Sequence, residues 1–337
     1  MDAFICDATR TPIGRFGGAL AFMRPDNMAA HVIQALLVRN PSLDPLAIDE
    51  VVFGCANQAG EDNRNVARMA TLLAGLPTDV PASTINRLCA SGMDAVALAG
   101  RGINTGDFRL VIAGGVESMS RAPLVVSRAD NAFSRSQQMF DTTIGWRFVN
   151  PLMQQIYGTD SMPETAENIA IDYAVSRQDQ DAFALRSQQR YAEAEQAGIF
   201  ADEITPVQDE RASNATTFLR QDEHPRPEMT HEKLAKLKGL NGDGLTVTAG
   251  NASGINDGAA ALLLSSWDTA AGFGLTPIAR IVASATAGVA PRVMGVGPVP
   301  ASQRALAKAG LSIGDIDVIE INEAFAAQVL ALPYAAL

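Results

Sequence analysis

The chain has 337 residues, of which 47% are hydrophobic and 19% are charged, a composition typical of a globular protein rather than a disordered or fibrous one. Its formal net charge of -11 argues against general nucleic-acid binding, because an acidic surface repels phosphate backbones. No apolar run reaches the roughly 18 residues that a membrane helix needs, and the N-terminus lacks a secretory pattern. We therefore expect a cytoplasmic protein with no membrane attachment.

The three cysteines indicate a free thiol rather than a structural cross-link. Cys6, Cys55 and Cys89 are far apart in the sequence, odd in number and not arranged in CxxC pairs. This spacing argues against a disulfide framework or a zinc site, so no metal is expected. At least one of the three can be a reactive thiol in a reducing compartment.

In chain order, the first elements alternate between strand and helix. Strands are expected at 3–6, 49–53 and 109–113, and helices at 25–38, at 63–74 and in the small-residue stretch that follows Cys89. This alternation predicts an α/β fold in which a mostly parallel sheet is covered by helices on both faces.

The middle of the chain has a different character. Residues from about 117 to 244 are polar and include helical pieces at 164–174 and 177–198, which indicates an inserted loop subdomain. The sheet pattern resumes with an expected strand at 245–248, and a loop, a helix and another strand are expected up to residue 266.

Residues 303–328 can be laid beside residues 34–58, since each segment has a helix, a turn, an Ile-Asp pair and an apolar strand. This similarity predicts a duplicated α/β unit with layered helices and sheets, although any two helix–strand segments share some of it. The sequence ends soon after Gln328, so the second unit is expected to be truncated. We expect an N-terminal domain at 1–268 and an incomplete C-terminal domain at 269–337.

Two polar residues stand where predicted elements meet. Cys89 precedes a predicted helix, whose dipole and free N–H groups favour a thiolate, as a nucleophile requires. The alternative is a small buried core cysteine. Asn322 follows a predicted strand at 317–321, where its amide can hold a water or donate to an oxyanion. The alternative for Asn322 is a helix N-cap.

Two segments are candidates for ligand binding. The loop Gly250–Gly254 is built of small residues that allow close backbone approach, and an ordinary turn is an equal alternative. The segment 224–238 carries two histidines, an arginine and three lysines in an acidic chain. It is a candidate for binding a phosphorylated ligand, and a solvated helix face is the alternative.

Together these segments resemble the thiolase family. The stretches that carry the resemblance cover nearly the whole chain in family order: RTPIGRFGG, NRLCASGMDAV, AGGVESMSRAP, MPETAEN, TVTAGNASGINDGAA, VMGVGPVPA and NEAFAAQ. Two further stretches, GCANQAGEDNRNVARMATLLAGLP and MFDTTIGWRFVNPLM, are similar to 3-oxoadipyl-CoA thiolases of aromatic-compound degradation.

The resemblance implies acyl transfer through a cysteine. Cys89 would attack the 3-keto carbon of 3-oxoadipyl-CoA, and CoA would then take up the acyl group, giving acetyl-CoA and succinyl-CoA. Asn322 matches the family position that holds an oxyanion-hole water. The positions that match the lining of the CoA pocket are Met162, Arg226, Ala249, Ser253, Ala324 and Phe325.

The resemblance also implies acyl-CoA substrates, CoA as a co-substrate with no permanently bound cofactor, and a homodimer or homotetramer. Within the inserted subdomain, Arg147 is the candidate partner of the distal carboxylate of 3-oxoadipyl-CoA. A salt bridge to Asp141, or plain solvation, is the alternative.

The sequence departs from the family pattern near its end. Thiolases carry a histidine in a GHPxGxSG-like loop and a second cysteine in a CxGxGxG-like loop. Here the only histidines are His31, His224 and His231, none of which lies in such a motif, and no cysteine follows Cys89. The alternatives are therefore a broad acetyl-CoA acetyltransferase and a non-catalytic thiolase fragment. A ketoacyl synthase fits the NEAFAAQ and TAGNASGINDG motifs less well.

Overall fold

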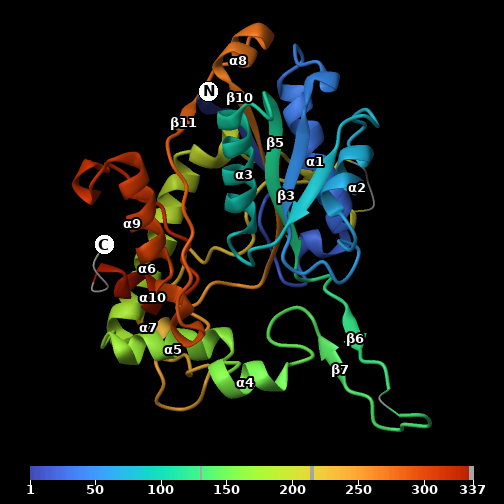
Figure 1. Ribbon diagram of the computed structural model, residues 1–337. Helices are drawn as coiled ribbons and strands as arrows, with labels where there is room; N and C mark the ends of the chain where they lie inside the picture. The colour runs from blue at the N-terminus through green and yellow to red at the C-terminus, as the bar shows by residue number, and fades with distance from the viewer. Residues whose placement is uncertain (130, 213–215, 334–337) are drawn as a thin grey trace. The chain divides into compact units, whose positions relative to one another are not determined.

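The computed structural model describes residues 1–129, 131–212 and 216–333 (Figure 1). Contacts between residues divide the chain into two units. The first unit comprises residues 1–144, 199–224 and 255–282, and the second comprises residues 145–198, 225–254 and 283–337. No helix among the described residues combines the length and the apolar character needed to cross a lipid bilayer.

The first unit is built around a mixed sheet in the order β11-β1-β10-β5-β3-β4, with β2 paired to β10. Its strands are β1 (Ala3–Arg10), β2 (Gly14–Arg15), β3 (Glu50–Gly54), β4 (Ala82–Ile85), β5 (Leu110–Ser118), β10 (Asn256–Ser266) and β11 (Ala279–Ile281). Strand β3 is parallel to β4 and β5, whereas β10 is antiparallel to both β1 and β5. The expectation of a mostly parallel sheet is therefore wrong.

Strand β10 also corrects the prediction of a loop and a helix before residue 266. Its Ala-Leu run favours a helix locally, but both of its edges are paired in register, with Ala261 opposite Thr9 of β1 and Gly114 of β5. A side chain at Gly114 would lie 2.1 Å from the carbonyl oxygen of Ala260, so the close approach of the two strands requires glycine there.

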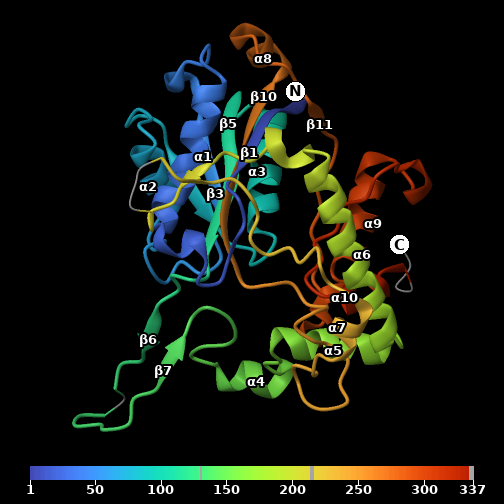
Figure 2. The ribbon, with the colours of Figure 1, turned by 180° about the vertical axis from the view of Figure 1, so that it is seen from behind.

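Helices cover both faces of this sheet, as expected. Helices α1 (Pro25–Arg39) and α2 (Val66–Leu73) lie on one face and α3 (Ser91–Thr105) on the other, and α8 (Trp267–Phe273) follows β10 (Figures 1 and 2). Because successive strand residues point to opposite faces, β5 supplies Leu110 and Ile112 to the core beneath α1, and Val111 and Ala113 to the core beneath α3.

The first unit also contains two short antiparallel pairs outside the main sheet. Strand β6 (Leu124–Val126) pairs with β7 (Met139–Asp141), and β8 (Val207–Gln208) pairs with β9 (Phe218–Leu219). Both pairs come from the stretch that the sequence marks as an insertion.

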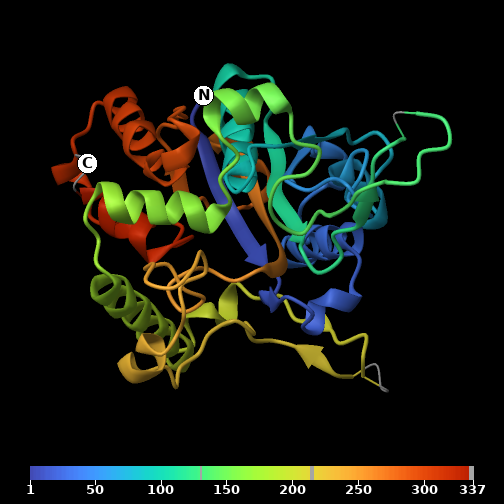
Figure 3. The same ribbon diagram turned by 90° about the horizontal axis from the view of Figure 1, so that it is seen from below.

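The second unit is mainly helical. Its helices are α4 (Pro151–Tyr157), α5 (Met162–Asp172), α6 (Arg177–Gln196), α7 (His231–Ala235), α9 (Pro298–Ala309) and α10 (Ala326–Ala331). Helix α10 packs against α5 and α6, and Figure 3 shows α5 and α10 side by side. A capping box at Ser161 and Glu164 begins α5, as the S-x-x-E pattern indicates.

Two predicted strands do not form in the second unit. Residues 245–248 are irregular, because the main-chain N–H groups of Thr246 and Val247 bind the Glu167 carboxylate instead of a neighbouring strand. Residues 317–321 are also irregular, although the preceding helix of the predicted repeat is present as α9. No described residue pairs with 317–321, and the side chains of Val318 and Ile319 are 77% and 56% exposed.

Candidate active site

Cys89 lies on the surface of the first unit, directly before α3. The N-cap residue of this 15-residue helix is Ala90, so the thiol stands one position ahead of the cap. The first turn of a helix leaves main-chain N–H groups without intrahelical partners, and the helix dipole favours an anion there. The alternative of a buried core cysteine is wrong for Cys89, whereas it describes Cys6 and Cys55.

The turn that presents Cys89 is closed by two polar side chains of its own segment. Leu88 adopts a left-handed conformation with φ of 50°. Its N–H donates to Asn86 Oδ1 at 2.8 Å. Ser91 Oγ accepts from the Arg87 N–H at 2.8 Å and donates to the Leu88 carbonyl oxygen at 2.6 Å. The sequence NRLCAS therefore encodes both the turn and the start of the helix.

Glycines fix the first turn of α3 against the sheet. A Cβ atom at Gly54, the last residue of β3, would lie 2.3 Å from the carbonyl carbon of Ser91. A Cβ atom at Gly115 of β5 would lie 3.0 Å from the carbonyl oxygen of Gly54 and 3.4 Å from the Cα of Gly92. Backbone packs on backbone here, so the place of the thiol is determined by the end of β3 and by Gly115 within β5.

Cys55 illustrates the opposite environment. Its thiol donates to Asp62 Oδ2 at 3.6 Å, and the Glu117 carboxylate accepts the N–H groups of Ala56 and Asn57 at 2.8 and 3.1 Å. Burial, reinforced by Glu117 and Asp62, raises the pKa of Cys55. The sulfur and the two carboxyl groups lie within 4.8 Å of one another. Burial beside these two carboxyl groups therefore keeps Cys55 as a thiol.

In the second unit, three of the six residues predicted to line a CoA pocket meet in one apolar cluster. Its members are Met162, Ala166, Val247, Ala252, Ala324 and Phe325. The predicted residue Ser253 adjoins the cluster, since its N–H donates to the Ala324 carbonyl oxygen at 2.8 Å. Ala249 lies in the same loop, within the turn closed by the bond from the Asn251 N–H to the Thr248 carbonyl oxygen.

Arg226, the sixth predicted residue, is anchored to α6. Its N–H donates to Gln188 Oε1 at 2.7 Å, and its guanidinium donates to the Pro225 carbonyl oxygen at 3.0 Å. In the basic segment that follows, His231, Lys236 and Lys238 are exposed. Exposure is compatible both with an anion-binding surface and with a solvated helix face, so both interpretations stay open for these side chains.

Asn322 lies exposed in the loop before α10. The N-cap of α10 is Phe325, with no side-chain cap, so the interpretation of Asn322 as the capping residue is wrong. The next residue, Glu323, accepts a hydrogen bond from Ser187 Oγ of α6 at 2.5 Å. The loop is thus tied to α6 beside the residue expected to hold a water.

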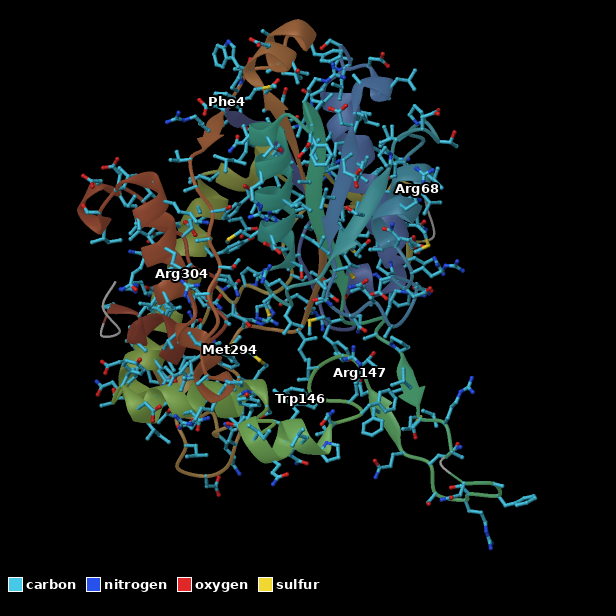
Figure 4. All side chains as sticks on the ribbon, viewed as in Figure 1. Phe4, Arg68, Trp146, Arg147, Met294 and Arg304 are labelled. Atoms are coloured by element: carbon cyan, nitrogen blue, oxygen red, sulfur yellow. The ribbon has the colours of Figure 1, made fainter. Side chains whose placement is uncertain are left out.

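Arg147 and Trp146 lie in the loop before α4 (Figure 4). The indole Nε1 of Trp146 donates to the Asp160 carbonyl oxygen at 3.2 Å, which fixes this loop to the start of α5. Arg147 is half-buried, and among the described residues of its own unit it forms no ion pair. Its guanidinium therefore retains capacity for an external carboxylate.

Two buried carboxylates of the second unit, Glu167 and Asp181, were not found from the sequence, and Asn251 was noted only as part of the loop Gly250–Gly254. Helical periodicity carried a signal for both carboxylates. Ala170 lies three residues after Glu167 and Leu185 four residues after Asp181, and both are buried, so each carboxylate falls on a buried helix face.

The sequence matches two protein-family descriptions. Residues 3–268 match "Thiolase, N-terminal domain" and residues 275–335 match "Thiolase, C-terminal domain".

Curated relatives and a solved structure cover nearly the whole chain. The chain is 64% identical over 331 residues to the "3-oxoadipyl-CoA/3-oxo-5,6-dehydrosuberyl-CoA thiolase" of Escherichia coli strain K12, covering 98% of this chain and 82% of that protein. It is 62% identical over 330 residues to the "Beta-ketoadipyl-CoA thiolase" of Pseudomonas aeruginosa, with the same coverage of each. The human mitochondrial 3-ketoacyl-CoA thiolase solved in complex with CoA superposes with a TM-score of 0.90 at 37% identity, covering 99% of this chain and 82% of that one. The predicted thiolase-like α/β fold is confirmed.

Proposed function

The chain belongs to the thiolase family of acyltransferases, and we propose that it cleaves 3-oxoadipyl-CoA with CoA through an acyl-Cys89 intermediate. The observation that carries this proposal is the exposed thiol of Cys89 at the N-terminal end of a 15-residue helix, in a chain whose other two cysteines are buried. The similarity to bacterial enzymes named for 3-oxoadipyl-CoA and beta-ketoadipyl-CoA supports the substrate.

The proposed reaction has two halves. In the first, the Cys89 sulfur forms a bond to the C3 carbonyl carbon, and the C2–C3 bond then breaks. Its electron pair stays on C2, which takes a proton and leaves as acetyl-CoA. In the second, the sulfur of free CoA attacks the succinyl-Cys89 thioester and releases succinyl-CoA, and the Cys89 sulfur regains a proton. The helix N-terminus favours the anionic sulfur that attacks in the first half and leaves in the second, before it regains its proton.

The remaining residues receive supporting roles in this proposal. Asn322 would hold the water that stabilises an oxyanion. The apolar cluster around Phe325, with Ser253, Ala249 and Arg226, would contact CoA. Arg147 would pair with the distal carboxylate of the acyl chain. We further propose CoA as a co-substrate without a permanently bound cofactor, a cytoplasmic location, a homodimer or homotetramer, and a boundary near residue 268 between N-terminal and C-terminal domains.

Mass spectrometry of the chain after mixing with acyl-CoA tests the proposal. Succinyl-CoA acylates the nucleophile by thioester exchange alone, whereas 3-oxoadipyl-CoA does so only after its carbon–carbon bond is cleaved. We expect both compounds to leave a succinyl group on the peptide that contains Cys89, and 3-oxoadipyl-CoA to release acetyl-CoA as well.

Two variants serve as controls. Cys89→Ser should carry no adduct, and Cys6→Ser, which replaces a buried thiol, should be acylated like the unmodified chain. A succinyl group on the peptide of Cys6 or Cys55, or none on that of Cys89, would reject Cys89 as the nucleophile. Acylation by succinyl-CoA without any by 3-oxoadipyl-CoA would reject the proposed cleavage.

A further inference from the structure

The segment 246–253 belongs to no strand, and apart from isolated bridges at Thr248 and Ala252 it is held in place by buried side chains of two helices. From α5, the Glu167 carboxylate accepts the Thr246 N–H at 2.9 Å, the Thr246 hydroxyl at 2.8 Å and the Val247 N–H at 2.9 Å. From α6, Gln180 Nε2 donates to Thr246 Oγ1 at 2.9 Å. Glu167 is only 5% exposed and Gln180 is fully buried. The start of the segment is therefore fixed by a charged group that is shielded from water.

Asn251, which is 3% exposed, is the central residue of the segment. Its Nδ2 donates to Asp181 Oδ1 at 3.0 Å and to the Thr246 carbonyl oxygen at 3.1 Å, while its Oδ1 accepts the Thr248 N–H at 2.8 Å. The other oxygen of Asp181 accepts from Arg177 Nε at 2.8 Å. The amide of Asn251 thus ties the turn to a carboxylate on α6 whose other oxygen accepts from an arginine.

Main-chain hydrogen bonds beside Asn251 connect this segment to the end of the loop that contains Asn322. The Asn251 carbonyl oxygen accepts the Ala326 N–H at 2.9 Å, the Ser253 N–H donates to the Ala324 carbonyl oxygen at 2.8 Å, and Ala252 pairs antiparallel with Phe325. These are the contacts that join the segment 324–326 to the segment 251–253. The start of α10 therefore takes its place from the turn that Asn251 closes.

We propose that Asp181 and Asn251 are positioning residues, which through their mutual hydrogen bond set both the loop of Ala249 and Ser253 and the segment that carries Asn322. The significance of this pair for CoA rests on the proposed function, but its effect on the two segments does not. Among the described residues, the two segments meet only at the first residue of α10 and at one isolated bridge, so loss of the pair should loosen both together. The deletion of a partner also leaves a buried polar group unsatisfied.

An exchange of the two side chains tests the pair without a large change in volume. Asn251→Asp places two carboxylates face to face, and the double variant Asp181→Asn with Asn251→Asp restores an amide opposite a carboxylate. Hydrogen–deuterium exchange, measured without ligand, should be faster in both peptides 246–254 and 322–332 of Asn251→Asp, and should return towards the original rate in the double variant. Glu193→Gln, which removes an exposed charge from the same helix, should leave both peptides unchanged.

Titration calorimetry with CoA measures the consequence for binding. We expect Asn251→Asp to raise the Kd for CoA at least about tenfold. The double variant should recover only part of this loss, because position 251 still lacks a donor for the Thr246 carbonyl oxygen. Should Asn251→Asp not fold, Asp181→Asn and Asp181→Leu make the same comparison. Asp181→Asn keeps an acceptor for the Asn251 amide and should bind CoA nearly as tightly as the unmodified chain. Asp181→Leu removes that acceptor and should bind CoA more weakly.

The outcomes separate the two proposals. Unchanged exchange in peptide 322–332 of Asn251→Asp, or a double variant no better than the single one, would overturn the positioning role. Equal effects of Asp181→Asn and Asp181→Leu would do the same. If exchange responds as expected but the unmodified chain does not bind CoA, the positioning role stands and the proposed function fails.

Discussion

At the scale of single residues, the surroundings of a cysteine decide whether its thiol is buried and inert or exposed and able to react. Cys55 is buried beside carboxyl groups and is kept as a thiol, whereas Cys89 is exposed where a helix begins. Nucleophilic thiols require access and a surrounding that tolerates the anion, and only the second place offers both. The residue type alone therefore does not identify the nucleophile, but the residues around it do.

Arg147 carries a prediction on substrate choice. A charge-assisted hydrogen bond contributes about 1.5–3 kcal/mol, so Arg147→Ala should lower kcat/KM for 3-oxoadipyl-CoA by roughly 10–100-fold. Acetoacetyl-CoA ends in a methyl group and should lose less than about twofold, because it offers no carboxylate to pair. Steady-state kinetics with both substrates make the comparison, and Arg190→Ala, an exposed arginine of α6, is the control. A loss of the same size on both substrates would rule out carboxylate recognition by Arg147.

At the scale of elements, the packing of α3 on the sheet can be tested by replacing Gly54 with alanine, and Gly272 with alanine as a control. Gly54→Ala forces a Cβ atom to 2.3 Å from the backbone of Ser91, whereas a Cβ atom at Gly272 of α8 has no neighbour within 4 Å. We expect Gly54→Ala to lower the free energy of unfolding by about 1–3 kcal/mol and to slow acylation of Cys89, since backbone must move. Gly272→Ala should raise it by about 0.5–1 kcal/mol through helix propensity.

Urea denaturation and the rate of Cys89 acylation measure these two effects. If Gly54→Ala were as stable and as readily acylated as the unmodified chain, the first turn of α3 would not depend on the end of β3.

The elements that were predicted correctly are those with a local pattern. The helix expected at 25–38 is found at Pro25–Arg39, and the strand expected at 49–53 at Glu50–Gly54. Strand β10 was predicted only in its last part, with a loop and a helix before it, because an Ala-Leu run suits either state. The deciding partners, β1 and β5, lie more than a hundred residues away in the sequence. The strands expected at 245–248 and 317–321 do not form, because neither segment has a partner strand among the described residues.

The same distinction applies to the candidate site. The position of Cys89 at a helix start is encoded within NRLCAS, and sequence analysis found it. The bond between Glu167 and Thr246 joins residues 79 positions apart, so no local pattern reveals it. What the sequence does reveal is a buried helix position for Glu167, from which a partner can be expected but not named.

At the scale of the whole molecule, folding changes the ionisation of buried thiols and so links stability to pH. Burial, together with the neighbouring Asp7, raises the pKa of Cys6 from 9.0 to about 11. Below pH 9 the thiol keeps its proton in both states, and its contribution to stability is complete. Between pH 9 and about 11 the unfolded chain loses the proton while the folded chain retains it, so the unfolded state is favoured. The raised pKa of Cys55 acts in the same direction.

The unmodified chain should therefore lose stability in alkali, and Cys6→Ala should lose less. A pKa shift of this size in Cys6 corresponds to about 2–3 kcal/mol in the free energy of unfolding. Cys6→Ala should therefore lose less stability than the unmodified chain between neutral and alkaline pH, by most of that amount. Urea denaturation at neutral pH and near the upper end of this range measures the loss, and lysine and tyrosine titration cancels when the two chains are compared. Cys89→Ala serves as the control for an exposed thiol. An identical alkaline loss in Cys6→Ala and the unmodified chain would mean that the Cys6 thiol does not hold its proton through folding.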